Sequence, residues 1–266
     1  MLLQRYLKNH KKASLNPSTY KEVNNLSQDK LLKLIPSQTL LKFNIPNIDK
    51  LFPGFTPGDF AVLYGMSTVL PLSLLLTVRA QLPFQLGGLE TNTIFVDGGN
   101  SFRLYEVSRI AQLHHLNPQQ VLQRIYISRA FTAYQMTSII LQKLKETVQK
   151  FNPKLVIISD IAGLFLDKDI PTREAKEIFN RLTIHLSEFA KENQIVIIAT
   201  HLFHRNSKRA VYFHAAICGR ANTVIAIKPS KFGQQFVLEK HPMFSLVRAE
   251  LSSENLTLSQ FMEAYE

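Results

Sequence analysis

Residues 59–82, DFAVLYGMSTVLPLSLLLTVRAQL, decide the fold. The first seven are a short apolar run that ends in Gly65, which is typical of a buried β-strand, and residues 72–82 have the composition of an apolar helix. A strand, a tight glycine turn and a helix form the unit that binds phosphate in many nucleotide-binding proteins. The sequence therefore predicts such a unit at the start of an α/β domain.

The turn in this unit lacks the residues that bind phosphate. The motif G-x-x-x-x-G-K-[ST] requires a second glycine, a lysine and a hydroxyl, and counted from Gly65 those positions hold Leu70, Pro71 and Leu72. Proline also removes a backbone N–H at the start of the helix, where phosphate would bind. We expect no cofactor beyond weak ATP or Mg binding. The residues of the turn left for that weak site are Gly65, Ser67 and Thr68.

The rest of the chain alternates strands with helices. Apolar runs predict strands at 92–97, 124–128, 154–159 and 194–199, and helical spacing predicts helices at about 102–115, 133–150 and 172–192. This alternation implies a mostly parallel sheet wound by helices on both faces. After residue 222 the pattern changes to strands at 222–228, 235–240 and 244–250, which predict an antiparallel extension of the sheet.

Several segments resemble, in order and spacing, the RecA/RadA recombinase core. They are residues 45–54 (IPNIDKLFPG), 97–103 (DGGNSFR), 128–135 (SRAFTAYQ), 155–165 (LVIISDIAGLF) and 238–242 (LEKHP). The resemblance covers residues 43–250 and is closest to archaeal RadA paralogues of the RadB or RadC kind. It implies a RecA-like P-loop core, with an archaeal and cytoplasmic setting.

The same resemblance exposes departures at the catalytic positions. The family's water-activating glutamate falls on Gly99, and its metal-side aspartate falls on Ser159, with Asp160 one residue late. The resemblance makes Asp160 the fourth residue of the weak nucleotide site. A slip of one residue in a strand turns a side chain to the other face. Loss of charge stabilisation and of a base each costs orders of magnitude in rate. We therefore predict that the chain is not an efficient ATPase.

A long basic interval is the second strong feature of a chain whose net charge is +11. No acidic residue occurs between Glu192 and Glu239. The resemblance places a mobile DNA-binding loop here, and cations interleaved with aromatic rings are typical of proteins that bind single-stranded DNA. The alternative is a solvated basic loop whose rings pack on the core. The predicted DNA contacts are Phe203, Arg205, Lys208, Arg209, Tyr212 and Arg220.

Partner binding is predicted from the resemblance alone. Ala130, Ala133 and Met136 correspond to a region that accepts a phenylalanine from a neighbouring recombinase protomer, although they could equally be ordinary core residues. The donor motif F-x-x-A is not evident in residues 37–45. We expect a chain that accepts a RadA-type recombinase or a sister paralogue but does not easily polymerise with itself.

The predicted organisation is a basic N-terminal arm or linker with helices (1–42), a RecA-like core (43–252) and a C-terminal helix (253–266). The single cysteine, Cys218, excludes an internal disulfide and is expected to be a small core residue. No metal site is expected, because the pair His201-x-x-His204 lacks a third ligand at suitable spacing. The uncharged stretch 61–78 is expected to be buried core rather than a membrane span, and the N-terminus does not resemble a secretory signal.

The function expected from these features is that of a non-catalytic RecA-fold paralogue. It would assist homologous recombination or DNA repair by binding single-stranded DNA and a partner recombinase. Two alternatives remain open. One is a KaiC-like regulatory protein that binds ATP without hydrolysing it efficiently, and the other is a purely structural subunit of a complex.

Overall fold

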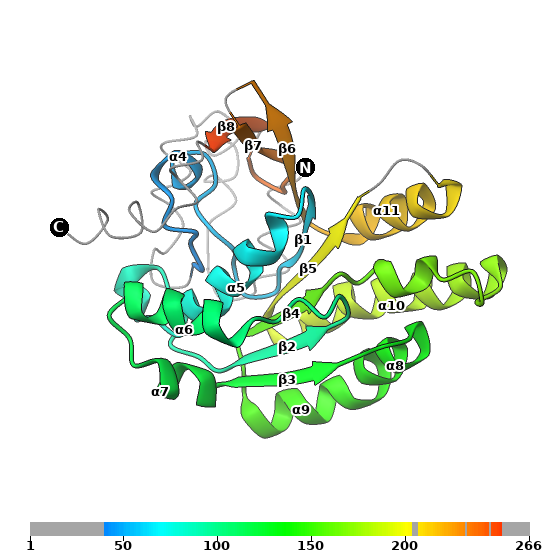
Figure 1. The fold of residues 1–266 in the computed structure, drawn as a ribbon, viewed down its shortest axis with the longest axis horizontal. Coiled ribbons are helices and arrows are strands. Elements are labelled where there is room, and N and C mark those ends of the chain that lie inside the picture. Colours follow the sequence, from blue (N-terminus) through cyan, green and yellow to red (C-terminus); the bar gives the residue numbers. More distant parts are fainter. Residues whose placement is uncertain (1–39, 204–206, 232, 245, 252–266) are drawn as a thin grey trace, which may run out of the picture.

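The computed structural model describes residues 40–203, 207–231, 233–244 and 246–251, labelled as in Figure 1. Its strands form one sheet in the order β3-β2-β4-β5-β1-β6-β7-β8. Neighbours from β3 to β6 are parallel, whereas β6, β7 and β8 pair antiparallel. The strands are β1 (Phe60–Gly65), β2 (Thr93–Asp97), β3 (Ile125–Arg129), β4 (Leu155–Ser159), β5 (Val196–Leu202), β6 (Thr223–Ser230), β7 (Gly233–Lys240) and β8 (Val247–Leu251). This arrangement confirms the predicted α/β fold with an antiparallel extension.

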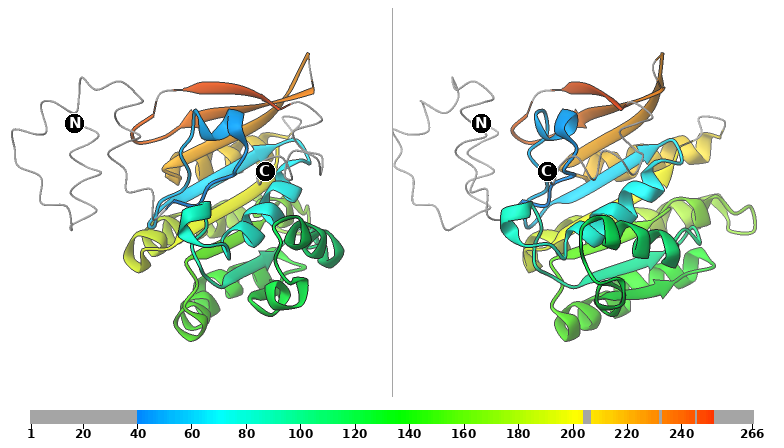
Figure 2. Two further views of the ribbon diagram at one scale, coloured as in Figure 1. Left: turned by 90° about the vertical axis from the view of Figure 1, so that its left-hand side faces the viewer. Right: turned by 60° about the vertical axis from the view of Figure 1, so that its left-hand side comes forward.

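Helices cover both faces of the sheet, as Figures 1 and 2 show. One face carries α5 (Val69–Arg79), α6 (Leu104–Leu113) and α7 (Pro118–Gln123). The other carries α8 (Ala133–Ser138), the π-helical turn η3 (Ile139–Lys143), α9 (Leu144–Phe151), α10 (Thr172–Asn193) and α11 (Lys208–Arg220). Short elements are α4 (Pro46–Asp49) and the 3-10 turns η2 (Phe84–Leu86) and η4 (Gly163–Leu166). None of the described helices is both long and apolar enough to cross a lipid bilayer.

Burial on both faces explains the continuous apolar runs of the central strands. In β1, Ala61 and Leu63 belong to the core under α5, while Phe60 and Val62 belong to the core under α10. A strand covered on both sides has no solvent face that would require polar residues. Because these strands are parallel, their carboxyl ends meet at one edge of the sheet, where Gly65 pairs with Leu202 and Asp97 pairs with Ser159. Ligands of α/β sheets generally bind at this edge.

The structure corrects one prediction in the second half of the chain. Residues 208–220 form helix α11 rather than a loop. The Ser207 hydroxyl accepts hydrogen bonds from the amides of Arg209 and Ala210, which caps the helix. Phe213 and Ile217 lie one turn apart and are fully buried against the sheet. The cap and the apolar stripe make this segment helical despite its basic charge.

The predicted domain boundaries are only partly covered by the described residues. Leu40 and Leu41 are already buried, and Leu41 exchanges both backbone hydrogen bonds with Phe55. The packed core therefore includes the last residues of the segment predicted as an arm. Residues 1–39 and the predicted C-terminal helix 253–266 lie outside the described residues.

Candidate functional site

The turn after β1 is shorter than the phosphate-binding motif would require. Gly65 has φ +120°, and a Cβ there would lie 2.2 Å from the carbonyl oxygen of Ile227, so only glycine fits. Helix α5 begins at Val69, one residue before the position of the motif's second glycine. Without that glycine the backbone continues directly into the helix.

Several backbone N–H groups of this turn are already hydrogen-bonded within the chain. The amide of Met66 donates to Ile227 O (3.2 Å), that of Val69 to Met66 O (3.1 Å) and that of Leu70 to Ser67 O (3.0 Å). A phosphate-binding loop instead leaves such groups open to its ligand. The Thr68 hydroxyl lies 2.6 Å from Oε1 of Gln234 on β7, to which it donates.

A cavity of about 460 Å³ lies between this turn and the start of α6. Its size is in the range of small-molecule sites. Its described lining is Ser67, Thr68, Leu70, Pro71, Leu74, Ser101, Arg103 and Glu106. Gly65 and Asp160 lie outside that lining, so the cavity gathers only two of the four residues predicted for a weak nucleotide site.

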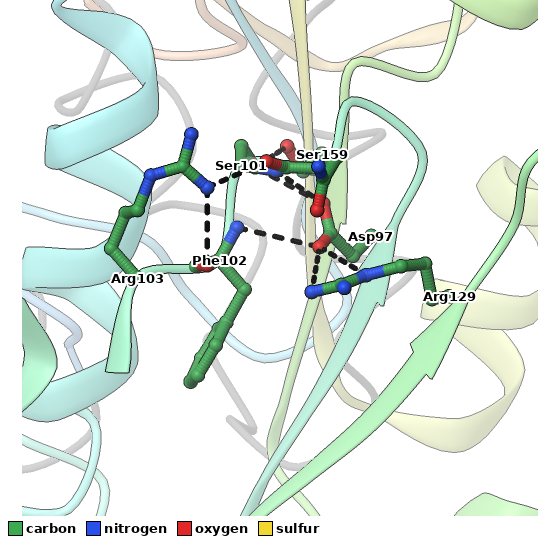
Figure 3. Close-up of polar contacts among 7 residues, drawn as sticks. Asp97, Ser101, Phe102, Arg103, Arg129 and Ser159 are labelled. Carbon is green, nitrogen blue, oxygen red and sulfur yellow. Dashed lines mark hydrogen bonds and ion pairs between the residues drawn. The ribbon is translucent and has the colours of Figure 1, made fainter. Parts of the chain in front are cut away.

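A polar network joins the ends of β2, β3 and β4 (Figure 3). The carboxylate of Asp97 is fully buried and accepts hydrogen bonds from the amides of Ser101 (2.8 Å) and Phe102 (3.4 Å). The guanidinium of Arg129 donates to the same carboxylate through Nε (3.1 Å) and Nη2 (3.0 Å). Ser159, at the predicted metal-side position, is buried and hydrogen-bonds the hydroxyl of Ser101. The network holds the segment after β2 against the sheet.

Asp160 lies beside Gly99, the position at which the resemblance predicts that a glutamate is replaced. It has a left-handed backbone with φ +47°, and its amide donates to Oγ1 of Thr200 at 3.2 Å. A Cβ on Gly99 would lie 2.8 Å from the Asp160 Cβ, and a Cβ on Gly163 would lie 2.2 Å from Oδ2 of Asp160. The side chain of Asp160 thus occupies space that side chains at positions 99 and 163 would need.

The structure does not bring the predicted DNA contacts onto one surface. Lys208 and Arg220 are exposed, but they stand at opposite ends of α11, 12 residues and so roughly 18 Å apart. Arg209 is half-buried and donates through Nη1 to Ile170 O at 3.1 Å. Arg205 lies outside the described residues.

The two predicted stacking rings are also engaged within the protein. The hydroxyl of Tyr212 accepts a hydrogen bond from Nδ2 of Asn180 (2.7 Å), and Nζ of Lys176 lies 4.5 Å from the centre of its ring. Phe203 stacks on His214 with ring centres 4.0 Å apart. Both aromatic side chains are half-buried. Rings packed on the core are what we expected if this interval does not bind DNA.

Sequence reasoning missed a cluster formed by His201, His214 and Cys218. Burial lowers the pKa of His201 to about 3 and raises that of the Cys218 thiol to about 12. The signal available in the sequence was the spacing of four residues between His214 and Cys218, which places them on one face of a helix. That signal depends on recognising α11 as a helix.

The residues predicted to bind a partner lie in the core. Ala130, Ala133 and Met136 are buried with the side chains under α10. Phe131 and Tyr134 are the exposed large hydrophobic side chains of the same segment, and Thr132 and Gln135 beside them are exposed too. The three residues predicted to bind a partner are therefore not accessible in this conformation, whereas the two rings are.

Comparison with known proteins agrees with this architecture. The family model of Rad51 matches residues 48–219, well over half of the chain. The chain is 29% identical over 158 residues to the DNA repair and recombination protein RadA of Aeropyrum pernix. That match covers 58% of this chain and 46% of RadA, so the chain spans about half the length of this relative. With its mostly parallel sheet and antiparallel extension, the chain belongs to the Rad51 family of RecA-like proteins.

Proposed function

We propose that this chain is a Rad51-family paralogue that assists homologous recombination or DNA repair without efficient ATP hydrolysis. The observation that carries this proposal is the turn after β1, in which Leu70, Pro71 and Leu72 replace glycine, lysine and hydroxyl. A relative that shares its core is a DNA repair and recombination protein, which supports the biological setting.

The proposed inefficiency of ATP hydrolysis follows from the side chains at the carboxyl edge of the sheet. A lysine and a metal-bound hydroxyl would stabilise charge on the transferred phosphate, and a glutamate would activate water. Position 99 is glycine, and the nearest carboxylate, that of Asp160, is packed against it. The chain would then contribute a RecA-type surface, rather than an ATPase cycle, to its complex.

Isothermal titration calorimetry with Mg-ATP tests this part of the proposal. We expect no binding in the micromolar range, and no ATP hydrolysis with or without single-stranded DNA. Micromolar affinity for ATP would contradict the proposal, since it requires phosphate contacts that the turn does not offer.

The cavity beside the turn favours a second candidate function, that of a regulatory protein that binds a nucleotide without hydrolysing it. Arg103 supplies a cation to the cavity lining, and Leu70 and Leu74 supply apolar surface. If a nucleotide binds here, Arg103→Ala should weaken binding by tenfold or more, because a charged hydrogen bond contributes roughly 1.5–3 kcal/mol. Equal affinity of Arg103→Ala and the parent would exclude this cavity as the nucleotide site.

DNA binding is proposed from charge. The net charge is +11, and the exposed cations Lys208 and Arg220 lie in an interval without acidic residues. Each phosphate contact to a single strand contributes about −0.7 to the slope of log affinity against log salt. Fluorescence anisotropy with a labelled oligonucleotide across a salt series measures that slope.

If both cations contact phosphate, we expect the double variant Lys208→Ala/Arg220→Ala to bind the oligonucleotide more weakly. Its slope of log affinity against log salt should then be less negative by about 1.4. Lys143→Ala/Lys145→Ala removes the same charge from exposed positions outside this interval and should leave the slope unchanged. If the first variant binds like the parent at every salt concentration, α11 is not the contact surface. The basic segment 1–42 would then be the next candidate.

A further inference from the structure

The cluster of His201, His214 and Cys218 lies between the sheet and α11. His201 is the last residue but one of β5 and is only 2% exposed. It lies two residues after Ala199, which faces the core under α10 and α11, so alternation along the strand places its ring on that face. His214 and Cys218 are half-buried, one turn apart on α11.

Aromatic rings wall this cluster. Tyr64 stacks beside His201 with ring centres 5.5 Å apart, and its ring centre lies 4.4 Å from that of His214. Phe203 stacks on the ring of His214. The hydroxyl of Tyr64 donates to Oε2 of Glu239 at 2.6 Å, which anchors the tyrosine. The three potential ligand atoms therefore meet among buried and half-buried side chains.

The distances between these atoms are those of ligands around a small tetrahedral metal ion. With Zn–N of about 2.0–2.1 Å and Zn–S of about 2.3 Å, tetrahedral angles put two nitrogens about 3.3 Å apart and a nitrogen and a sulfur about 3.6 Å apart. Nε2 of His201 lies 3.3 Å from Nδ1 of His214, which lies 3.6 Å from Sγ of Cys218. All three atoms lie within 4.8 Å of one another.

We propose that His201, His214 and Cys218 bind one transition-metal ion, with zinc the best fit, through two imidazole nitrogens and one thiolate. Nitrogen and sulfur donors suit zinc rather than magnesium or calcium. Three protein ligands leave a fourth position for water or another exogenous ligand.

Zinc binding at this site would release one proton. Both histidines coordinate as neutral rings, and the Cys218 thiol loses its proton to solvent as the Zn–S bond forms. Burial disfavours the free thiolate and raises the pKa of this thiol. A bound dication beside the sulfur has the opposite effect, and a coordinating thiol is deprotonated outright.

This site goes beyond the proposed function and does not depend on it. The ion would join the end of β5 to α11. These two elements follow one another in the chain, and α11 begins at Lys208. Metal binding would therefore fix the position of α11 on the sheet. Without metal, the same side chains pack through hydrogen bonds alone.

Cobalt substitution in the wild-type chain tests the site, because Cys218 is the only cysteine of its 266 residues. Any thiolate-to-cobalt charge-transfer absorption must therefore come from this residue. After treatment with a chelator, we expect one equivalent of Co²⁺ to give this absorption together with tetrahedral d–d bands. One equivalent of Zn²⁺ should abolish both. Absence of the charge-transfer band would overturn the proposal.

Thermal unfolding and ligand variants provide independent readouts. Zinc at about a hundredfold excess over Kd should raise Tm by roughly 5–10 °C. Cys218→Ser should remove the charge-transfer band. It should also weaken zinc binding by more than the roughly 10–100-fold that is typical when a residue hydrogen-bonded to a metal ligand is lost. His115→Asn is the matched control, since this exposed histidine has φ +54°, which asparagine tolerates. Equal zinc affinity in Cys218→Ser and wild type would overturn the proposal. If Cys218→Ser does not fold, the wild-type cobalt spectrum decides alone.

Discussion

At the scale of single residues, the glycine at position 99 and the aspartate at position 160 form one steric unit. A side chain at 99 would begin 2.8 Å from the Cβ of Asp160, closer than side-chain carbons approach. A glutamate at 99 would therefore require Asp160 to move. The identity of residue 99 and the position of the Asp160 side chain are sterically coupled.

We expect Gly99→Ala to lower the free energy of unfolding by about 1–3 kcal/mol through overpacking. In an Asp160→Gly background the same change should cost much less, because the obstructing Cβ is gone and glycine suits the left-handed backbone at 160. Chemical denaturation of the double-mutant cycle measures this coupling. Gly219→Ala is the control, since a Cβ there meets nothing within 4 Å. Additive effects at 99 and 160 would contradict the steric explanation.

At the scale of elements, the accuracy of the sequence predictions depended on the kind of signal. Continuous apolar runs placed β4 at 154–159, against Leu155–Ser159 observed, and helical spacing placed α10 at 172–192, against Thr172–Asn193. The start of α5 was predicted at 72 and lies at Val69, because a turn without its second glycine continues into helix. Helix α11 was missed because family resemblance, rather than local pattern, guided that prediction.

The candidate site was less predictable than the fold. The strand-end positions of Gly65 and Ser159 followed from the motifs, and the structure places both at the carboxyl edge of the sheet. The contact of Gly99 with Asp160 and the meeting of His201 with Cys218 depend on how separate elements pack. No local pattern contains that information.

On α11, neighbouring basic residues should respond differently to truncation. Arg209→Ala removes the hydrogen bond to Ile170 O and the packing of the guanidinium 5.9 Å from the Phe213 ring, so we expect a loss of about 1–2 kcal/mol. Lys208→Ala, at an exposed position, should change the free energy of unfolding by at most about 0.5 kcal/mol. Urea denaturation of both variants measures the difference. Equal effects would show that Arg209 is not anchored as described.

At the scale of the whole molecule, two histidines make stability depend on pH, of which His114 is buried and His241 half-buried. Burial lowers the pKa of His241 to about 3 and that of His114 to about 4, both from 6.5. The unfolded chain binds protons that the folded chain rejects, so stability present above pH 6.5 is lost as pH falls. Burial raises the pKa of Asp49 from 3.8 to about 6, which acts in the opposite direction between those values.

The contribution of His241 can be isolated by substitution. Its Nδ1 accepts hydrogen bonds from the amides of Met243 (3.1 Å) and Phe244 (3.2 Å), which an asparagine oxygen can replace. Between about pH 6 and 4, His241→Asn should lose less stability than the parent, by roughly 1.4 kcal/mol per pH unit. Urea denaturation at a series of pH values measures the slopes. Identical slopes would mean that folding does not hold His241 as a neutral ring.

We expect assembly with a partner through the edge of the sheet formed by β3. This terminal strand presents Ile127 to solvent, and the segment after it exposes Phe131 (68%) and Tyr134 (50%). Within residues 40–251 as described, no strand pairs with the outer edge of β3, and such an edge beside exposed rings is typical of an interaction surface. We expect a RadA-type recombinase or sister paralogue to bind here.

Phe131→Asp should weaken that binding at least tenfold, measured by calorimetry, because burying a phenyl ring contributes about 1.5–3 kcal/mol. Its Tm should match the parent, since the ring is exposed, whereas Ala133→Asp should unfold the protein by placing a charge in the core. Without a partner we expect small-angle scattering of a single chain, since residues 37–45 lack a donor phenylalanine motif. Long filaments of this chain alone would contradict the expectation that it does not polymerise with itself. Unchanged partner affinity in Phe131→Asp would exclude this edge as the surface that accepts a partner.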